Sequence, residues 1–149
     1  MTAKEYLEQL PDMRIRIKAI RQRINEFKER ASDTAAKLSD QHSSSGVGKV
    51  EGNVMRAVDI EAQLKEIVQE FEEFELRASQ QISKLPTGIY SSLLFNRYIN
   101  GMTWEDIAEE IDKGVEYVRT ELHSKALAEF SLCYPDYPRL SPCILPKKV

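Results

Sequence analysis

Apolar residues in the first part of the chain recur at alternating spacings of four and three positions. The stripe consists of Tyr6, Leu10, Met13, Ile17, Ile20, Ile24, Phe27 and Ala31. This spacing places one apolar stripe along a helix and predicts a coiled-coil contact. Pro11 interrupts the stripe, so either the helix kinks there or a long helix begins there with Pro11 in its first turn.

A second stripe of the same kind predicts a helix over residues 54–84. It consists of Ala57, Ile60, Leu64, Ile67, Phe71, Phe74, Ala78, Ile82 and Leu85. Residues 39–53 (SDQHSSSGVGKVEGN) are rich in Ser and Gly and predict a flexible loop. Two long amphipathic helices joined by one loop are expected to fold as an antiparallel coiled-coil hairpin over residues 1–85. The pattern leaves open whether the stripes meet within one chain or between two chains.

The two predicted helices carry charges of opposite sign beside their apolar stripes. Residues 14–30 contain seven basic and two acidic side chains, whereas residues 59–75 contain seven acidic and one basic. Opposite flanking charges favour pairing of these two helices and set their orientation. A contact of the basic run with a DNA backbone, or plain solvation, is the alternative.

Residues 86–130 predict a smaller module of three helices, over about 88–100, 104–111 and 115–130. Gly101 ends the first helix at a position that favours positive φ, and Thr103 is placed as the N-cap of the second. A three-residue turn, Asp112-Lys113-Gly114, precedes the third. This is the helix-turn-helix plan. Its expected core consists of Leu94, Tyr98, Trp104, Ile107, Ala108, Ile111, Val118 and Leu122.

The polar flank of the third helix supplies the candidate DNA contacts. With Val118 and Leu122 inside, the expected interface is Thr103, Glu116, Tyr117, Arg119, Thr120, His123 and Lys125. Arg119 suits guanine or phosphate, Glu116 suits the cytosine amino group, and the other side chains suit bases or backbone. Thr103 and the amides after it are placed to hold a phosphate. Solvated surface is the alternative for each residue.

The segment LLFNRYINGMTWEDIAEEI, residues 93–111, resembles the helix-turn-helix of sigma factor region 4. The chain over residues 1–130 resembles a family of small phage and prophage proteins. They share an AKEYL-type opening, a Ser/Gly loop and a module that ends in LH-x-x-AL, here residues 122–127. This resemblance implies kinship with late-gene transcription activators of the ArpU and RinA type.

The turn departs from the sigma pattern at several positions. Asp112 stands where glycine is usual, Lys113 where a small apolar residue is usual, and Gly114 where a Ser or Thr cap is usual. The LH-x-x-AL ending also lies one residue later, relative to Val118, than the sigma pattern places it. These changes are expected to loosen the turn and to shift which side chains reach a base.

The last segment, residues 131–149, carries four prolines and is expected to be extended, because proline prevents a regular helix. The alternative is that Tyr134, Tyr137 and Ile144 pack against the body. The two cysteines, Cys133 and Cys143, both lie in this tail, so neither a disulfide framework nor a metal site is expected.

The sequence gives no sign of an enzyme or of a membrane protein. No phosphate-binding loop, HExxH motif or nucleophile elbow is present, so no catalytic residue, cofactor or metal is expected. No apolar run approaches the length of a membrane-spanning helix, and the opening residues are not a secretory signal, which indicates a cytoplasmic protein.

These patterns together predict an all-α transcription regulator of the phage type. Its expected partners are a promoter-like DNA site, host RNA polymerase and a second copy of the chain, with the hairpin serving for dimerisation or polymerase contact. Two alternatives remain. An acidic module that binds RNA polymerase or a sigma factor without DNA is one, and a small terminase-like packaging subunit is the other.

Overall fold

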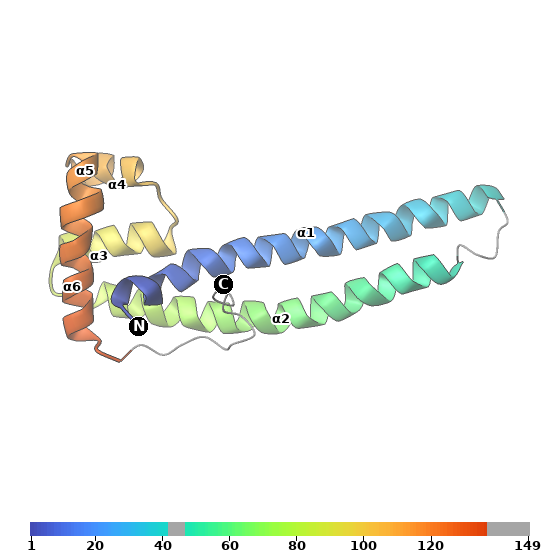
Figure 1. Cartoon of the computed structure of the whole chain (residues 1–149), viewed down its shortest axis with the longest axis horizontal. Coiled ribbons are helices and arrows are strands. Elements are labelled where there is room, and N and C mark those ends of the chain that lie inside the picture. The colour runs from blue at the N-terminus through green and yellow to red at the C-terminus, as the bar shows by residue number, and fades with distance from the viewer. Residues whose placement is uncertain (42–46, 137–149) are drawn as a thin grey trace. The chain divides into compact units, whose positions relative to one another are not determined.

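The computed structural model describes residues 1–41 and 47–136, and the side chains of residues 1–33, 52 and 54–136. Every regular element in this part of the chain is helical (Figure 1). The elements are α1 (Ala3–Gln41), α2 (Val47–Ser83), α3 (Gly88–Leu94), η2 (Phe95–Ile99), α4 (Trp104–Ile111), α5 (Val115–Tyr117), η3 (Val118–Leu122) and α6 (His123–Cys133). The elements η2 and η3 are π-helical turns, in which a backbone N–H bonds five residues back. The prediction of an all-α fold is confirmed.

Helix α1 begins at Ala3, so the alternative that a long helix starts at Pro11 is wrong. Its start is fixed by a reciprocal cap that sequence reasoning missed. The Thr2 backbone N–H donates to the Glu5 carboxylate at 2.8 Å, and the Glu5 N–H donates to the Thr2 hydroxyl at 3.1 Å. This is the capping-box arrangement, which satisfies backbone donors that a helix leaves unpaired at its N-terminus.

The predicted loop over residues 39–53 is too long, because residues 39–41 belong to α1 and residues 47–53 belong to α2. A long helix gains one backbone hydrogen bond for each residue added, whereas a glycine costs only about 1 kcal/mol relative to alanine. Ser- and Gly-rich composition therefore does not stop an established helix. Residues 42–46 lie outside the described part of the chain.

The chain forms two compact units, and α1 and α2 contribute to both. One unit consists of Arg14–Gln69. Within it, the segments of α1 and α2 run side by side, and Lys28 of the basic run forms an ion pair with Glu61 of the acidic run (Figure 1). Where its side chains are described, the buried apolar residues of this unit all belong to the predicted stripes, and they are Ile17, Ile24, Phe27, Ala31, Ala57 and Leu64.

The other unit consists of Met1–Met13 and Glu70–Val149, so the first turns of α1 belong with the small module. Its core joins three distant segments. The Tyr6 ring lies 5.1 Å from the Phe74 ring, edge to face, and 6.0 Å from the Phe130 ring, stacked. The Tyr6 hydroxyl donates to the Gln81 side chain at 2.8 Å, which satisfies the polar end of this buried residue.

The start of the tail is helical, since α6 continues to Cys133. Tyr134 then packs against the body, as the alternative prediction had it. Its ring lies 5.0 Å from the Phe130 ring, and its hydroxyl donates to the Gln81 carbonyl at 2.9 Å. Tyr137 and Ile144 lie outside the described residues. None of the described helices is both long enough and apolar enough to cross a membrane.

Candidate nucleic-acid interface

Helix α4 has the bounds that the sequence predicts. The Asp106 N–H donates to the Thr103 hydroxyl at 3.2 Å, which confirms Thr103 as the N-cap. The helix ends where Asp112 adopts the left-handed conformation, with φ 54° and ψ 52°. Aspartate is among the few non-glycine residues that tolerate this region. Asp112 therefore serves where glycine is usual, and Gly101 occupies its predicted positive-φ position at φ 67°.

We predict that Thr103→Ala destabilises the protein by about 1 kcal/mol, because the cap hydroxyl satisfies an otherwise unpaired backbone donor. Urea unfolding measures this loss. Thr103→Ser should retain most of the stability. Thr120→Ala is the matched control, because the exposed Thr120 hydroxyl only donates back to the Glu116 carbonyl within its own helix, at 2.6 Å. Equal losses for Thr103→Ala and Thr120→Ala would contradict the capping role.

The predicted contact flank lies on the continuous helical run α5–η3–α6. Glu116, Tyr117, Arg119 and Thr120 are exposed on it, and so is Lys125 one turn further. The opposite side is buried, and it is formed by Val118, Leu122, Ala126 and Phe130. The polar flank is thus separated from the hydrophobic packing of the same helices.

Both cations of this flank are paired with an acid on their own helix. The Arg119 guanidinium forms an ion pair with Glu116, and Lys125 Nζ lies 3.0 Å from the Glu121 carboxylate. The hydrogen bond from Lys125 to Glu121 raises the pKa of the lysine. A phosphate or base that uses either cation must compete with this acid. Such exposed pairs contribute little stability, so the competition costs little.

His123 was predicted on the exposed flank as a candidate DNA contact, and the prediction that its side chain is exposed there is wrong. The side chain is buried, with its ring 4.7 Å from the Trp104 ring and its Nε2 atom 2.8 Å from the Tyr98 hydroxyl. The reason is the π-helical turn η3. A π turn holds one residue more than an α turn, so residues five apart align, and His123 lies on the same side as the buried Val118.

Six of the eight predicted core residues of the module are buried, namely Leu94, Tyr98, Ile107, Ala108, Val118 and Leu122. Trp104 and Ile111 are only half-buried, which corrects their prediction. Trp104 stands at the start of α4 and faces an open cleft. Ile111 is the last residue of α4, so no further turn of that helix covers it.

Two polar residues of η2 were missed by sequence reasoning. Asn96 is buried, and its side chain hydrogen-bonds with Glu110 at 3.3 Å and with Asn100 at 3.0 Å. Arg97 donates to the Met102 carbonyl at 3.1 Å, and its guanidinium carbon lies 4.3 Å from the centre of the Trp104 ring. Together these contacts tie η2 to α4.

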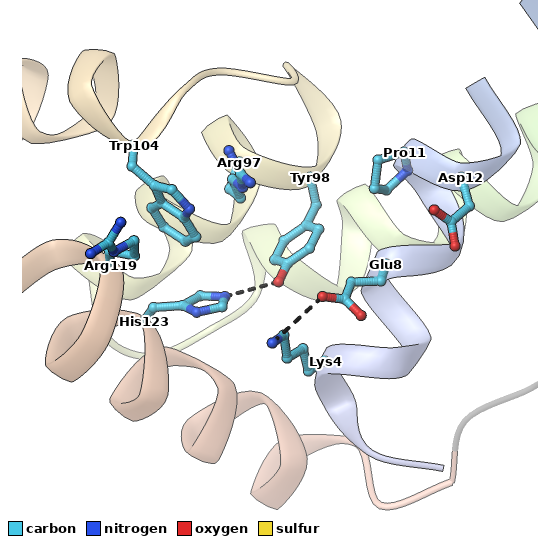
Figure 2. A pocket seen from close by; sticks show the side chains of 9 residues that line it. All are labelled: Lys4, Glu8, Pro11, Asp12, Arg97, Tyr98, Trp104, Arg119 and His123. Carbon is cyan, nitrogen blue, oxygen red and sulfur yellow. Dashed lines mark hydrogen bonds and ion pairs between the residues drawn. The ribbon is translucent and has the colours of Figure 1, made fainter. Parts of the chain in front are cut away.

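A cleft of about 560 Å³ opens in this unit (Figure 2). It is lined by Lys4, Glu8, Pro11, Asp12, Arg97, Tyr98, Trp104, Arg119 and His123. Burial, aided by the positive charges of Lys4 and Arg97, lowers the pKa of His123 to about 4. Burial, aided by the negative charge of Glu8, raises the pKa of Tyr98. Both groups are therefore neutral at pH 7, and the formal charges of the cleft come from its lysine, arginines and carboxylates.

Among the described residues, no three histidine, cysteine or acidic side chains are grouped so that they could hold a metal ion. Comparisons with protein-family models, with curated proteins and with solved structures found no match to this chain.

Proposed function

We propose that this protein is a sequence-specific DNA-binding transcription regulator of the phage type. In this proposal, the flank formed by Glu116, Tyr117, Arg119 and Thr120 reads a promoter-like site. The observation that carries the proposal is the separation of faces on α5–η3–α6. Polar side chains are exposed on one side, while Val118, Leu122, Ala126 and Phe130 are buried on the other. The resemblance to sigma factor region 4 points to the same function.

The chemistry of the flank suits reading of the major groove. An arginine can donate two hydrogen bonds to guanine, and a glutamate can accept one from the cytosine amino group. Arg119 and Glu116 are one helical turn apart and paired with each other, so a G·C-containing site would offer a partner to each. Lys125 and Thr103 would contact the backbone, which fixes the position of the protein but not the sequence that it reads.

The unit formed by Arg14–Gln69 would serve for dimerisation or for contact with RNA polymerase. Val54, Met55 and Val58 of α2 are exposed, with 48%, 67% and 57% of their surface accessible. Apolar side chains grouped on a surface are typical of interaction sites. The mass of the protein in solution tests this part of the proposal. A dimer is expected, whereas a large ring would favour a packaging subunit.

Selection from a pool of random duplex DNA at low salt tests the proposed function. We expect enrichment of a short common sequence, and the selected duplex should bind at least about a thousandfold more tightly than random DNA. Folding of the protein is checked by circular dichroism. Folded protein that enriches no sequence and retains no DNA would contradict the proposal.

Arg119→Ala should weaken binding to the selected site by about 1–3 kcal/mol and binding to random DNA much less, because a lost base contact affects only the cognate sequence. Fluorescence anisotropy with both duplexes measures the two losses. Arg77→Ala, which removes an exposed arginine of α2, is the control and should leave both affinities unchanged. Equal losses on both duplexes for Arg119→Ala would make this residue a phosphate contact and would remove it from base reading.

Acidity of the module favours a second candidate function, the binding of RNA polymerase or a sigma factor without DNA. Residues 86–130 contain eight acidic and four basic side chains, and Arg119 and Lys125 are both paired with acids. An acidic surface attracts basic partners and repels phosphates. Capture of host RNA polymerase by folded protein that enriches no DNA would favour this function over DNA reading.

A further inference from the structure

The cleft in Figure 2 combines three kinds of chemical group on two walls. The first turns of α1 provide Lys4, Glu8 and Asp12. The opposite wall provides Arg97, Trp104 and Arg119, and the neutral Tyr98 and His123 lie between them. The cleft therefore offers cations, carboxylates and an aromatic surface to a single ligand. Of the side chains that line the cleft, only Arg119 also belongs to the proposed DNA-reading flank.

The aromatic surface belongs to Trp104. Its indole is half-buried and lines the cleft, and it is held in place by the Arg97 guanidinium at 4.3 Å and by the edge-on His123 ring at 4.7 Å. The Arg97 guanidinium lies over one face of the indole, so a planar ring would have to stack on the opposite face, and it could do so without much further loss of side-chain freedom. Stacking on aromatic residues is how proteins commonly hold nucleobases, and it tolerates any base because every base has a flat face.

Arginine and lysine side chains supply sites for an anion. Arg97 has five N–H donors, and its hydrogen bond to the Met102 carbonyl uses one of them. Arg119 lines the same wall as Arg97. Lys4 lines the opposite wall, where its Nζ lies 3.7 Å from the carboxylate of Glu8 on the same helix. Charge-assisted hydrogen bonds from guanidinium groups are well suited to phosphate oxygens.

The carboxylates of Glu8 and Asp12 would repel an anion close to them, but they accept hydrogen bonds from hydroxyl groups. Acidic side chains commonly bind the ribose hydroxyls of nucleotides in this way. The volume of about 560 Å³ lies within the range of roughly 300–1,000 Å³ that is usual for small-molecule sites. The ligand that uses all three kinds of group is one that joins a planar base, a ribose and a phosphate.

We propose that the cleft binds a ribonucleoside monophosphate. The base stacks on Trp104, the phosphate lies against Arg97, Arg119 and Lys4, and the ribose hydroxyls donate to Glu8 or Asp12. Arg119 is shared with the proposed DNA-reading flank, whereas Lys4, Glu8, Asp12, Arg97 and Trp104 are not, so nucleotide binding can be tested without DNA and can fail or succeed separately from DNA reading.

Trp104 is the only tryptophan of the chain, so its fluorescence reports the cleft directly. The full-length protein is titrated with AMP, GMP, CMP and UMP, excited at the red edge of the indole band to avoid absorption by the bases. We expect saturable quenching by at least one of them. Adenosine, ribose 5-phosphate, inorganic phosphate and a deoxynucleotide each lack part of the ligand, and each should bind about tenfold or more weakly than the best nucleotide.

Substitutions then test which side chain contacts the phosphate and which contacts the ribose. Lys4→Gln should weaken the nucleotide severalfold while leaving the nucleoside unchanged. Arg97→Gln should weaken the nucleotide about tenfold or more, and the nucleoside to a smaller degree, because Arg97 also contacts the Trp104 ring. Lys4 is exposed, so its substitution tests the phosphate site even if Arg97→Gln does not fold. Asp12→Asn with Glu8→Gln should reduce the preference for the ribonucleotide over the deoxynucleotide. Arg77→Gln is the control and should change nothing.

Three results would overturn the proposal. The first is the absence of saturable quenching at millimolar nucleotide, with calorimetry also detecting no binding. The second is equal affinity for inorganic phosphate and nucleotide, which would leave an adventitious anion only. The third is preferred occupation of the cleft by a short DNA strand over any free nucleotide, which would assign the same groups to a nucleic-acid chain.

Discussion

Phe130→Ala is expected to destabilise the unit formed by residues 1–13 and 70–136 by about 3–5 kcal/mol, because it deletes a fully buried aromatic ring. The Phe130 side chain has no accessible surface. Its ring lies 6.0 Å from the Tyr6 ring and 5.0 Å from the Tyr134 ring. The cavity left by the substitution would therefore adjoin residues from both ends of the described chain.

The contact between Phe130 and Tyr6 also connects the candidate interface with the first turns of α1. Phe130 belongs to α6, which continues the helical run that carries Arg119, whereas Tyr6 belongs to the first turns of α1. We therefore expect the segment from α4 to α6 to depend for its stability on residues 1–13. Loss of this contact should weaken the proposed DNA binding indirectly, through partial unfolding rather than through a lost DNA contact.

Urea unfolding followed by Trp104 fluorescence measures the loss, since the indole lies in the same unit. Leu132→Ala is the matched control on the same helix. Leu132 has 85% of its surface accessible, so its truncation should change the free energy of unfolding by less than about 0.5 kcal/mol. A loss below about 1 kcal/mol for Phe130→Ala would show that this contact is not part of a cooperative core.

The elements that could be predicted from the sequence are those fixed by local or periodic rules. The apolar stripes follow the repeat that a long helix needs in order to bury one face against a partner, and most of their members are buried. The bounds of α4 follow from the Thr103 cap and from the turn at Asp112, which are local hydrogen-bonding and φ/ψ effects. The cap at Thr2 and Glu5 was equally local, and its T-x-x-E signature was available in the sequence.

The π-helical turn η3 could not be predicted from an α-helical repeat, because that repeat assumes 3.6 residues in every turn. The sequence did contain one sign of this π turn. The LH-x-x-AL ending lies one residue later, relative to Val118, than the sigma pattern places it, and one extra residue is what a π turn contains. Interpreted in this way, the displacement would have moved His123 from the exposed flank to the buried side.

The cleft lies beyond sequence reasoning for a different reason. Its lining residues range from Lys4 to His123, and nothing local connects the first turns of α1 with η2 and η3. Tertiary packing, such as that of Tyr6 against Phe74 and Phe130, places these segments in one unit. Periodicity assigns residues 1–13 to a coiled coil, and it contains no information about which module they contact.

Acidification is expected to destabilise this unit through His123. Its pKa in the folded protein is lowered to about 4 by burial and by the charges of Lys4 and Arg97, against an ordinary value of 6.5. Above pH 6.5 the ring is neutral in both the folded and the unfolded protein and contributes no pH dependence. Between pH 6.5 and 4 the unfolded chain binds a proton that the folded protein excludes, so stability falls as the pH falls. The loss levels off below about pH 4, at up to about 3 kcal/mol.

The free energy of unfolding, measured at intervals from pH 7 to pH 4 with Trp104 fluorescence, checks this prediction. Carboxylates also titrate near the lower end, so the test is the difference between the protein and His123→Gln. The glutamine can still accept from the Tyr98 hydroxyl but cannot be protonated, so this variant should be less stable at pH 7 and should lose less stability on acidification. His42→Gln removes the only other histidine and should keep the full pH dependence. Identical pH profiles for His123→Gln and the unsubstituted protein would mean that the buried ring is protonated in the folded protein as readily as in water.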